Sequence, residues 1–250
     1  MNNETIDHDQ LFKELLHQLF AEFMQLFFPE HAAKLDFTTV KFLEQEKFTD
    51  FPEGAHRYVD TLVEIKTLSG EPEIILIHAE FQSDRKSGFP LRMFRYFCQI
   101  RLRGDTRLFA GVLYLPSAPV GLGWETYSEE LFGDEYLLYR FHCISLPKLS
   151  AAEYLKTKNP VAYGLAPLMD FENEMSRVEL KAVCIVGIGE CQNLNEVQSA
   201  LLFHFLETYL KLTPEEEEEV QKRIVTEEVT PMQIVNPYVL RGELRAMHRT

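Results

Sequence analysis

Two short apolar runs, one after the other in the chain, carry polar residues at the positions that most constrain the fold. Residues 57–66 and 74–82 are rich in β-branched side chains and are separated by a turn-forming segment. This pattern predicts two neighbouring strands, in which successive side chains point to opposite faces. Asp60 lies in the first run, and Glu80 and Gln82 share one face of the second. A carboxylate among apolar residues is costly to bury unless it is paired or binds a metal, so these acids are the first candidates for a functional site.

The composition is that of an ordinary folded protein. The chain has 250 residues, of which 46% are hydrophobic and 26% are charged, so it can bury a sizeable core. No apolar run approaches the roughly 20 residues that cross a bilayer, and the N-terminus lacks the pattern of a signal peptide. The four cysteines are scattered, without the paired spacing of a zinc site. We therefore expect a cytoplasmic protein with no membrane partner.

Charge is unevenly distributed along the chain. The formal net charge of −14 argues against general binding to polyanions. Between residues 85 and 107, however, seven Lys and Arg residues accompany one acid, Asp105, which gives a local excess of six positive charges. A basic segment beside the acidic strands is what a nuclease needs, because phosphate contacts provide much of the affinity for nucleic acid. A solvated helix face is the alternative explanation.

Hydrophobic periodicity predicts an α/β layered domain over residues 1–150. The expected elements, in chain order, are a helix at 9–28 that ends at Pro29, strands at 40–48, 57–66 and 74–82, a helix from Pro90 to Gly104, and strands at 108–115 and 136–146. Trp124, between the last two strands, is expected to anchor a loop, and stacking on a nucleic-acid base is the alternative.

The second part of the chain, residues 151–250, is predicted to be a helical extension. Its expected helices span residues 151–158, 173–190, 194–212 and 214–225. Glutamates 215–219 are expected to form a solvated helix start, where acids interact favourably with the helix dipole. The tail from Thr226 has two prolines and no sustained period, so it is expected to be loosely ordered.

The polar residues of the two strands fit metal-dependent phosphodiester hydrolysis. This reaction needs an attacking hydroxide and neutralisation of charge on the phosphate, and a divalent ion bound by carboxylates supplies both. Mg²⁺ accepts a few carboxylates and keeps several waters, so Asp60 and Glu80 would suffice as its main protein ligands, with Mn²⁺ as a substitute. Gln82 would orient the attacking water or contact the phosphate, and Asp9 and Glu14 are outer candidates. Two exposed or salt-bridged strand acids are the alternative explanation.

The helix expected after these strands has a basic side. Arg92, Arg95 and Arg103 recur at helical spacing, so they form one stripe that suits DNA phosphates. The other side of this helix is apolar and is expected to pack on the sheet.

Several blocks of the sequence together resemble the Rpn family. They are spread over residues 7–120, at 9–13, 35–37, 48–50, 58–63, 77–83 and 92–97. The Rpn proteins are recombination-promoting nucleases, also described as transposases, in the PD-(D/E)XK nuclease superfamily. The resemblance implies a restriction-endonuclease-like core, which is a mixed central sheet flanked by helices. It also implies Mg²⁺-dependent DNA cleavage that promotes recombination.

The resemblance assigns roles to individual positions. Asp60 takes the place of the motif's Asp, and Glu80 takes that of its acidic second member. The usual Lys of the superfamily is Gln82 here, which removes a positive charge that helps the hydroxide to form. Family members with Glu-x-Gln are similar, so this departure is compatible with activity. Lys13 or Lys66 could supply a replacement charge.

Two functions from different classes follow. The first is a Mg²⁺-dependent DNA endonuclease that uses Asp60, Glu80 and Gln82 for catalysis and the arginine stripe for DNA. The second is a nuclease-fold protein that cuts slowly or never and binds DNA or a protein partner. The acidic net charge and the missing Lys favour the second. RNA as substrate and a homodimer formed through the helical extension are left open.

Overall fold

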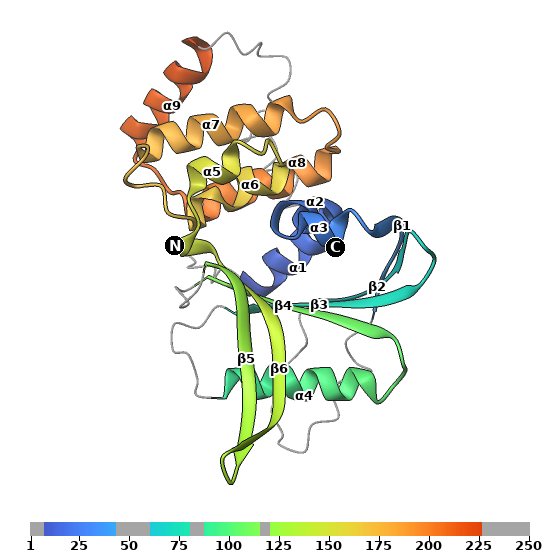
Figure 1. Ribbon diagram of the computed structural model, residues 1–250. Coiled ribbons are helices and arrows are strands. Elements are labelled where there is room, and N and C mark those ends of the chain that lie inside the picture. Colours follow the sequence, from blue (N-terminus) through green and yellow to red (C-terminus); the bar gives the residue numbers. More distant parts are fainter. Residues whose placement is uncertain (1–7, 44–60, 81–87, 116–120, 227–250) are drawn as a thin grey trace. The chain divides into compact units, whose positions relative to one another are not determined.

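The computed structural model describes residues 8–43, 61–80, 88–115 and 121–226, and the chain divides into two compact units (Figure 1). The first unit holds residues 8–17 and the described chain from 23 to 148. The second holds residues 18–22 and the chain from 149 to 226. The candidate site lies in the first unit.

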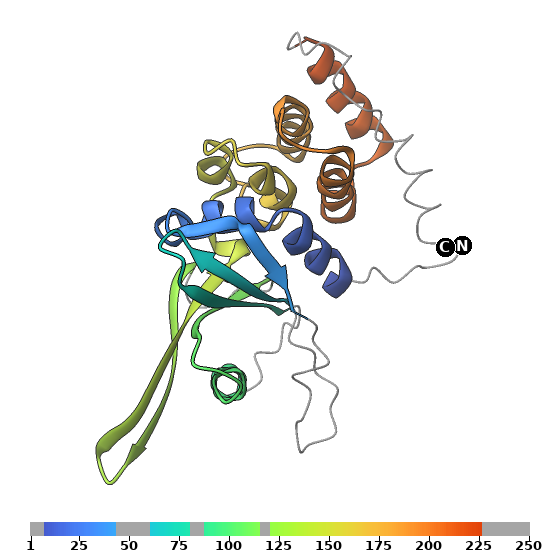
Figure 2. The same cartoon turned by 90° about the vertical axis from the view of Figure 1, so that its right-hand side faces the viewer.

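A six-stranded mixed sheet forms the centre of the first unit. The strands are β1 (Leu35–Phe42), β2 (Thr61–Thr67), β3 (Pro72–Glu80), β4 (Arg107–Tyr114), β5 (Leu122–Leu131) and β6 (Asp134–Ser145). They are ordered β1-β2-β3-β4-β6-β5; β3, β4 and β6 run parallel, and the other neighbours pair antiparallel. Helices lie on both sides of this sheet (Figure 2). The predicted α/β class, a restriction-endonuclease-like core followed by C-terminal helices, is confirmed.

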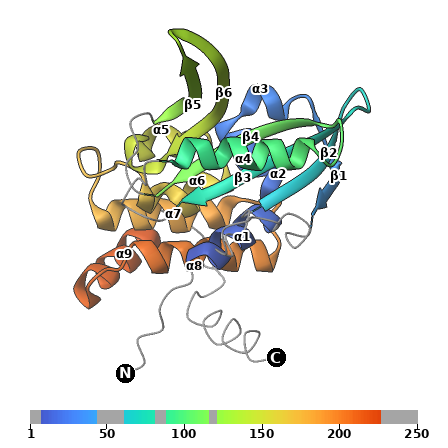
Figure 3. The same ribbon diagram turned by 90° about the horizontal axis from the view of Figure 1, so that it is seen from below.

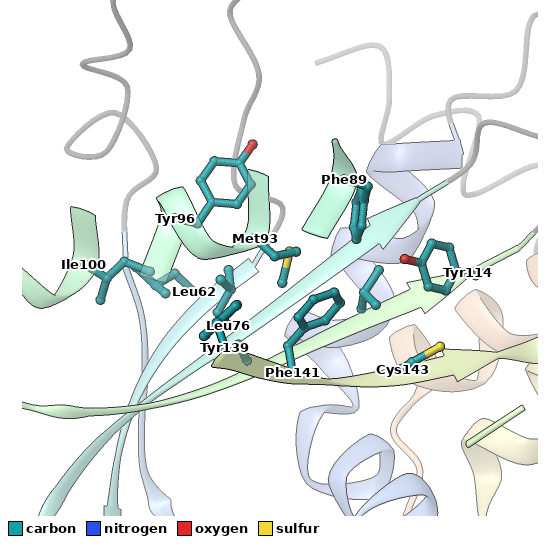
Figure 4. Packing of buried hydrophobic residues seen from close by; sticks show 12 residues of the cluster. Leu62, Leu76, Phe89, Met93, Tyr96, Ile100, Tyr114, Tyr139, Phe141 and Cys143 are labelled. Carbon is teal, nitrogen blue, oxygen red and sulfur yellow. The ribbon is translucent and has the colours of Figure 1, made fainter. Parts of the chain in front are cut away.

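Helix α4 (Phe89–Arg101) covers one face of the sheet and forms the crossover between the parallel strands β3 and β4 (Figure 3). Met93 and Phe89 point from the helix onto Leu76 and Phe141 of the sheet (Figure 4). All four side chains are at least 95% buried. This confirms the predicted apolar side of the helix, whose burial is the main stabilising contribution to this layer.

The N-terminal helical segment differs from the single helix expected at 9–28. It consists of α1 (His8–Gln18), α2 (Phe20–Phe27) and α3 (Pro29–Ala32). The expected helix end before Pro29 is confirmed, since α2 ends at Phe27. Pro29 also begins α3, because the first turn of a helix does not use the N–H that proline lacks. Phe28 lies against Phe109 of β4, with ring centroids 5.0 Å apart, so this junction packs on the face opposite α4.

Two further expectations about this unit are corrected. The first strand lies at 35–42 instead of 40–48, and residues 44–48 are outside the described part of the chain. Trp124 lies on strand β5, not in a loop, and pairs with His142 of β6. Strand β5 is at the edge of the sheet, where a largely exposed strand does not need the apolar pattern that reveals a buried one.

The second unit contains the four expected C-terminal helices with different limits, and α6 in addition. They are α5 (Ala151–Leu155), α6 (Pro160–Leu165), α7 (Arg177–Glu190), α8 (Glu196–Tyr209) and α9 (Pro214–Thr226). Pro160 lies between two of the expected helices and begins α6, where the side chain of Asn159 accepts a hydrogen bond from the N–H of Val161. Ser176 and Asn195 start α7 and α8 with reciprocal capping boxes. The tail at 227–250 lies outside the described residues.

Gly187 allows α6 and α7 to pack closely. A Cβ atom at this position would lie 2.2 Å from the ring of Tyr163, a distance at which the ring or the helix must move. Gly187 is therefore required by the helix contact and not by its backbone angles.

The acidic start of α9 contributes to the packing of the second unit. Lys181 of α7 is 1% exposed, and its Nζ forms ion pairs with Glu217 of α9 and, at 2.9 Å, with Glu207 of α8. The expectation of a purely solvated glutamate run is therefore wrong for Glu217. Since a buried charge is costly without partners, this triad fixes the relative positions of three helices.

Candidate functional site

Strand pairing brings the start of β2 and the end of β3 to the same end of the sheet. Thr61, the residue after Asp60 in the chain, is the first residue of β2 and pairs with Ile77 of β3. Strand β3 ends three residues later at Glu80, whose partner on β4 is Tyr114. Asp60 and Gln82 lie outside the described residues, and Glu80 is described by its backbone alone. The start of β2 and the end of β3 thus meet where the sequence predicts a metal site.

Lys13 and Glu14, two of the auxiliary residues predicted on the first helix, lie on α1 beside a contact with strand β1. Strand β1 ends at Phe42, which pairs with Val63, and the ring of Phe42 stacks on His17 of α1 at a centroid distance of 3.8 Å. Lys13 and Glu14 precede His17 by one helical turn, and their charges act on its pKa in opposite directions while burial lowers it. Since Val63 follows Leu62, which packs under α4, the contact lies on the opposite face of the sheet from α4.

Two other predicted contributors are less favourably placed. Asp9 is exposed in the first turn of α1, a further turn away from His17. Lys66 pairs with Pro72 at the opposite end of β2 from Thr61. Thr61 and Lys66 are five residue steps apart along the strand, or about 16 Å. Lys66 is therefore poorly placed to replace the motif lysine, and a replacement charge from Lys13 stays a prediction.

The predicted arginine stripe is divided by the end of α4. Arg92 is half-buried, with its guanidinium over the ring of Phe89 at 4.6 Å, and Arg95 is exposed on the same helix. Arg103 lies beyond Arg101, the last residue of α4, in the turn that follows. The expectation that Arg103 continues the helical stripe is wrong. The chain leaves the helix before Gly104, with backbone hydrogen bonds from Leu102 and Arg103 closing the last turn.

A buried polar pair that the sequence analysis missed lies beneath the start of α4. The hydroxyl of Tyr114 donates a hydrogen bond of 3.0 Å to the carboxylate of Glu125 on β5, and both residues are more than 90% buried. The ring of Phe89 lies 5.5 Å from that of Tyr114. In the sequence Glu125 is one acid in an apparent loop, so nothing separates it from a surface residue. The pair joins the end of β4, next to the Glu80 position, to the edge strand.

The opposite face of the sheet holds an aromatic cluster around His142. Its ring centroid lies 3.8 Å from that of Trp124, with the rings tilted, and its ring stacks on Phe109 at 4.5 Å. The guanidinium of Arg140 lies over Trp124 at 5.5 Å. The half-exposed indole therefore contacts two side chains of β6, which is consistent with an anchoring role.

Burial lowers the pKa of His142 from 6.5 to about 4, and the charge of His31 adds to this effect. Because the folded state binds the proton more weakly than the unfolded state, stability is full above about pH 6.5 and decreases as the pH falls toward 4. Urea unfolding between these limits should show this loss in the wild type. The decrease should be smaller in His142→Phe, which keeps an aromatic ring and removes the titration. Equal decreases in the two proteins would contradict the assignment.

The described residues contain neither a cluster of metal-ligating side chains nor a membrane-spanning helix. No group of three or more His, Cys, Asp or Glu side chains in the described segments is arranged to hold a metal ion. In the same segments, no helix has both the length and the apolar character required to cross a membrane.

Comparison with known proteins identifies the N-terminal part of the chain. Residues 6–106 match the family described as "Putative transposase, YhgA-like". This segment runs from the first helix to just before β4 and contains Asp60, Glu80 and the arginines of α4. Neither the curated proteins nor the solved structures gave a match. The family match confirms the resemblance found in the sequence: over residues 6–106 the chain is similar to the YhgA-like putative transposases.

Proposed function

We propose that the protein is a metal-dependent DNA endonuclease whose strand breaks promote recombination. The observation that supports this most directly is the pairing of Thr61 with Ile77, which joins the start of β2 to the last part of β3. Leu62 and Leu76 pair with each other and pack against α4. Position 60 is two residues from Leu62 and position 80 is four residues from Leu76, and side chains at such spacings in a strand share a face. Asp60 and Glu80 would then act on the face of the sheet that carries α4 and its arginines.

The proposed donors fit magnesium or manganese. Two carboxylates with water completing the shell are typical ligands for Mg²⁺, and Gln82 would add a neutral amide oxygen. When bound, the ion would supply the hydroxide and neutralise charge on the phosphate. Gln82 would orient the water or contact the phosphate. Lys13 and Glu14 stay predictions as auxiliary groups, because the contact of His17 with Phe42 puts their helix on the opposite face of the sheet from α4.

A cleavage assay with supercoiled plasmid tests the proposal. With Mg²⁺ or Mn²⁺ the wild-type protein should nick or linearise the plasmid, and EDTA should stop the reaction. Titration calorimetry of the same protein with Mn²⁺ shows whether a metal binds independently of turnover. Metal binding without cleavage of DNA or RNA would favour the second function, a nuclease-fold binding protein. The net charge of −14 and the presence of Gln82 in place of Lys also favour that function.

The role of the α4 arginines can be measured through the salt dependence of DNA binding. Arg95→Ala should weaken binding and reduce the slope of log K against log salt by about one, because one phosphate contact is lost. Arg92→Ala should act in the same direction and also lose its contact with Phe89. Fluorescence anisotropy at several salt concentrations measures the slope.

Arg107→Ala is the matched control for these variants. Arg107 is also exposed, but it already forms ion pairs with Glu71 and Glu73. Its removal should leave the salt slope unchanged. If Arg95→Ala behaves like this control, Arg95 does not contact the DNA backbone.

A further inference from the structure

Strands β5 and β6 form a hairpin that extends beyond the helix layer (Figures 1 and 2). Its base packs on α4, where Phe94 contacts Tyr127 and Tyr139 at ring distances of 5.4 and 5.6 Å. Residues 128–138, which follow Tyr127 and precede Tyr139, are here called the arm. The arm belongs to the same unit as the candidate site.

The tip of the arm is a strained turn with an exposed aromatic residue. Leu131 pairs with Asp134, so Phe132 and Gly133 form a two-residue turn, and their φ angles are +56° and +90°. Such turns favour Asn, Asp or Gly, and a bulky residue with positive φ is an outlier. The side chain of Phe132 is 92% exposed, so packing within the chain does not stabilise it. A strained and exposed phenylalanine indicates a contact outside the chain.

The chemistry of the arm favours a protein surface over nucleic acid. Besides Phe132, Leu131, Tyr136 and Leu138 are each more than half exposed. The arm contains four acids and no Lys or Arg; the acids are Glu129, Glu130, Asp134 and Glu135. Such a charge repels phosphate, whereas apolar and aromatic side chains are enriched at the centres of protein interfaces.

The end of α4 has the complementary character. Leu102 is 86% exposed, and it is followed by the exposed Arg103. Both belong to the segment 85–107 with its excess of six positive charges. Because Phe132 and Leu102 are almost fully exposed in one chain, they do not contact each other there. Each copy therefore presents an acidic, apolar arm and a basic, apolar helix end.

We propose that two copies of this chain form a dimer in which the arm of each copy docks on the α4 end of the other. Phe132 and Leu131 would pack on Leu102 of the second copy, and the carboxylates of the arm would face Arg103. Two such contacts related by a twofold axis close the assembly. Contact between two arms is disfavoured, because it would bring two sets of four carboxylates together. This proposal goes beyond the endonuclease function and does not depend on it.

Sedimentation equilibrium of the full chain tests the dimer, and Phe132→Gly tests the arm. The wild type should be dimeric at micromolar concentration and should dissociate more readily as salt rises. Glycine accepts the positive φ, so Phe132→Gly should keep or raise thermal stability. Its dimer dissociation constant should rise by at least about tenfold, because a buried aromatic anchor is lost. Loss of the dimer in a stable protein separates docking from folding.

The helix end has its own test and control. Arg103→Glu should weaken the dimer, and adding Glu135→Arg to this variant should restore part of it. Leu68→Ala removes another exposed apolar side chain, in the turn between β2 and β3, and should have no effect. A monomeric wild type would overturn the proposal, as would a dimer unaffected by Phe132→Gly. A dimer sensitive to Phe132→Gly but not to Arg103→Glu would overturn the assigned docking surface.

Discussion

Glu80→Gln is expected to reduce metal-dependent DNA cleavage by more than about 100-fold, since even residues that only support metal ligands contribute 10-fold to 100-fold. The substitution keeps the size and hydrogen-bonding capacity of the side chain and removes the charge that would hold the ion. Asp60→Asn should have the same effect, because the two residues are proposed to bind one metal. The rate of plasmid nicking under single-turnover conditions measures this effect.

Two further measurements make this experiment decisive. Calorimetric titration with Mn²⁺ should show affinity weakened by at least about tenfold in both variants, which links the lost activity to the metal. Glu73→Gln is the matched control, because Glu73 lies on the same strand β3, at the end far from Glu80, and pairs with Arg107. This control should cut DNA at the wild-type rate. Normal cleavage by Glu80→Gln would remove this residue from the site.

Lys181→Ala is expected to destabilise the helices of the second unit by about 3 to 5 kcal/mol, the usual effect of breaking a buried ion pair. The substitution removes the cation between Glu207 and Glu217, and with it a side chain that is 99% buried. Urea unfolding followed by far-UV circular dichroism reports on these helices. The fluorescence of Trp124, the single tryptophan, reports on the first unit in the same samples.

Controls separate this buried triad from an ordinary surface pair. Lys222→Ala removes the partner of Glu218 in the same helix α9, where both side chains are 70% exposed, and should cost less than about 1 kcal/mol. Changing all three charged residues, as Lys181→Met with Glu207→Gln and Glu217→Gln, should recover part of the lost stability. If Lys181→Ala is no more destabilising than Lys222→Ala, the triad does not hold the helices together.

The sequence was informative where periodicity and local chemistry agree. The β-branched runs around Glu64 and Leu76 and the apolar side of the helix near Met93 correctly predicted β2, β3 and α4. The prediction failed where exposure or local geometry overrides the pattern. Strand β5 lies at an edge and is largely exposed, so it lacks the apolar pattern of an inner strand. Pro160 fits the first turn of a helix as well as it ends one.

For the candidate site, the sequence predicted two neighbouring strands that carry the acids. The pairing of Thr61 with Ile77 shows that β2 and β3 are such neighbours. The roles of Asp60 and Glu80 remain predictions. The contacts of Glu125 with Tyr114 and of Lys181 with Glu217 could not have been predicted in this way. Each joins residues on different elements, and a single sequence contains no signal for such pairing.

The crossover from β3 through α4 to β4 has a consequence for exchanging function between related proteins. The proposed metal ligands, Gln82 and the two arginines of α4 all fall between residues 60 and 95. One continuous stretch of sequence therefore contains the principal proposed groups, and the C-terminal helices contribute none of them. A chimera that receives this interval from a relative with Glu-x-Lys should acquire that relative's metal preference and cleavage rate, while the recipient's remaining sequence supplies the supporting sheet.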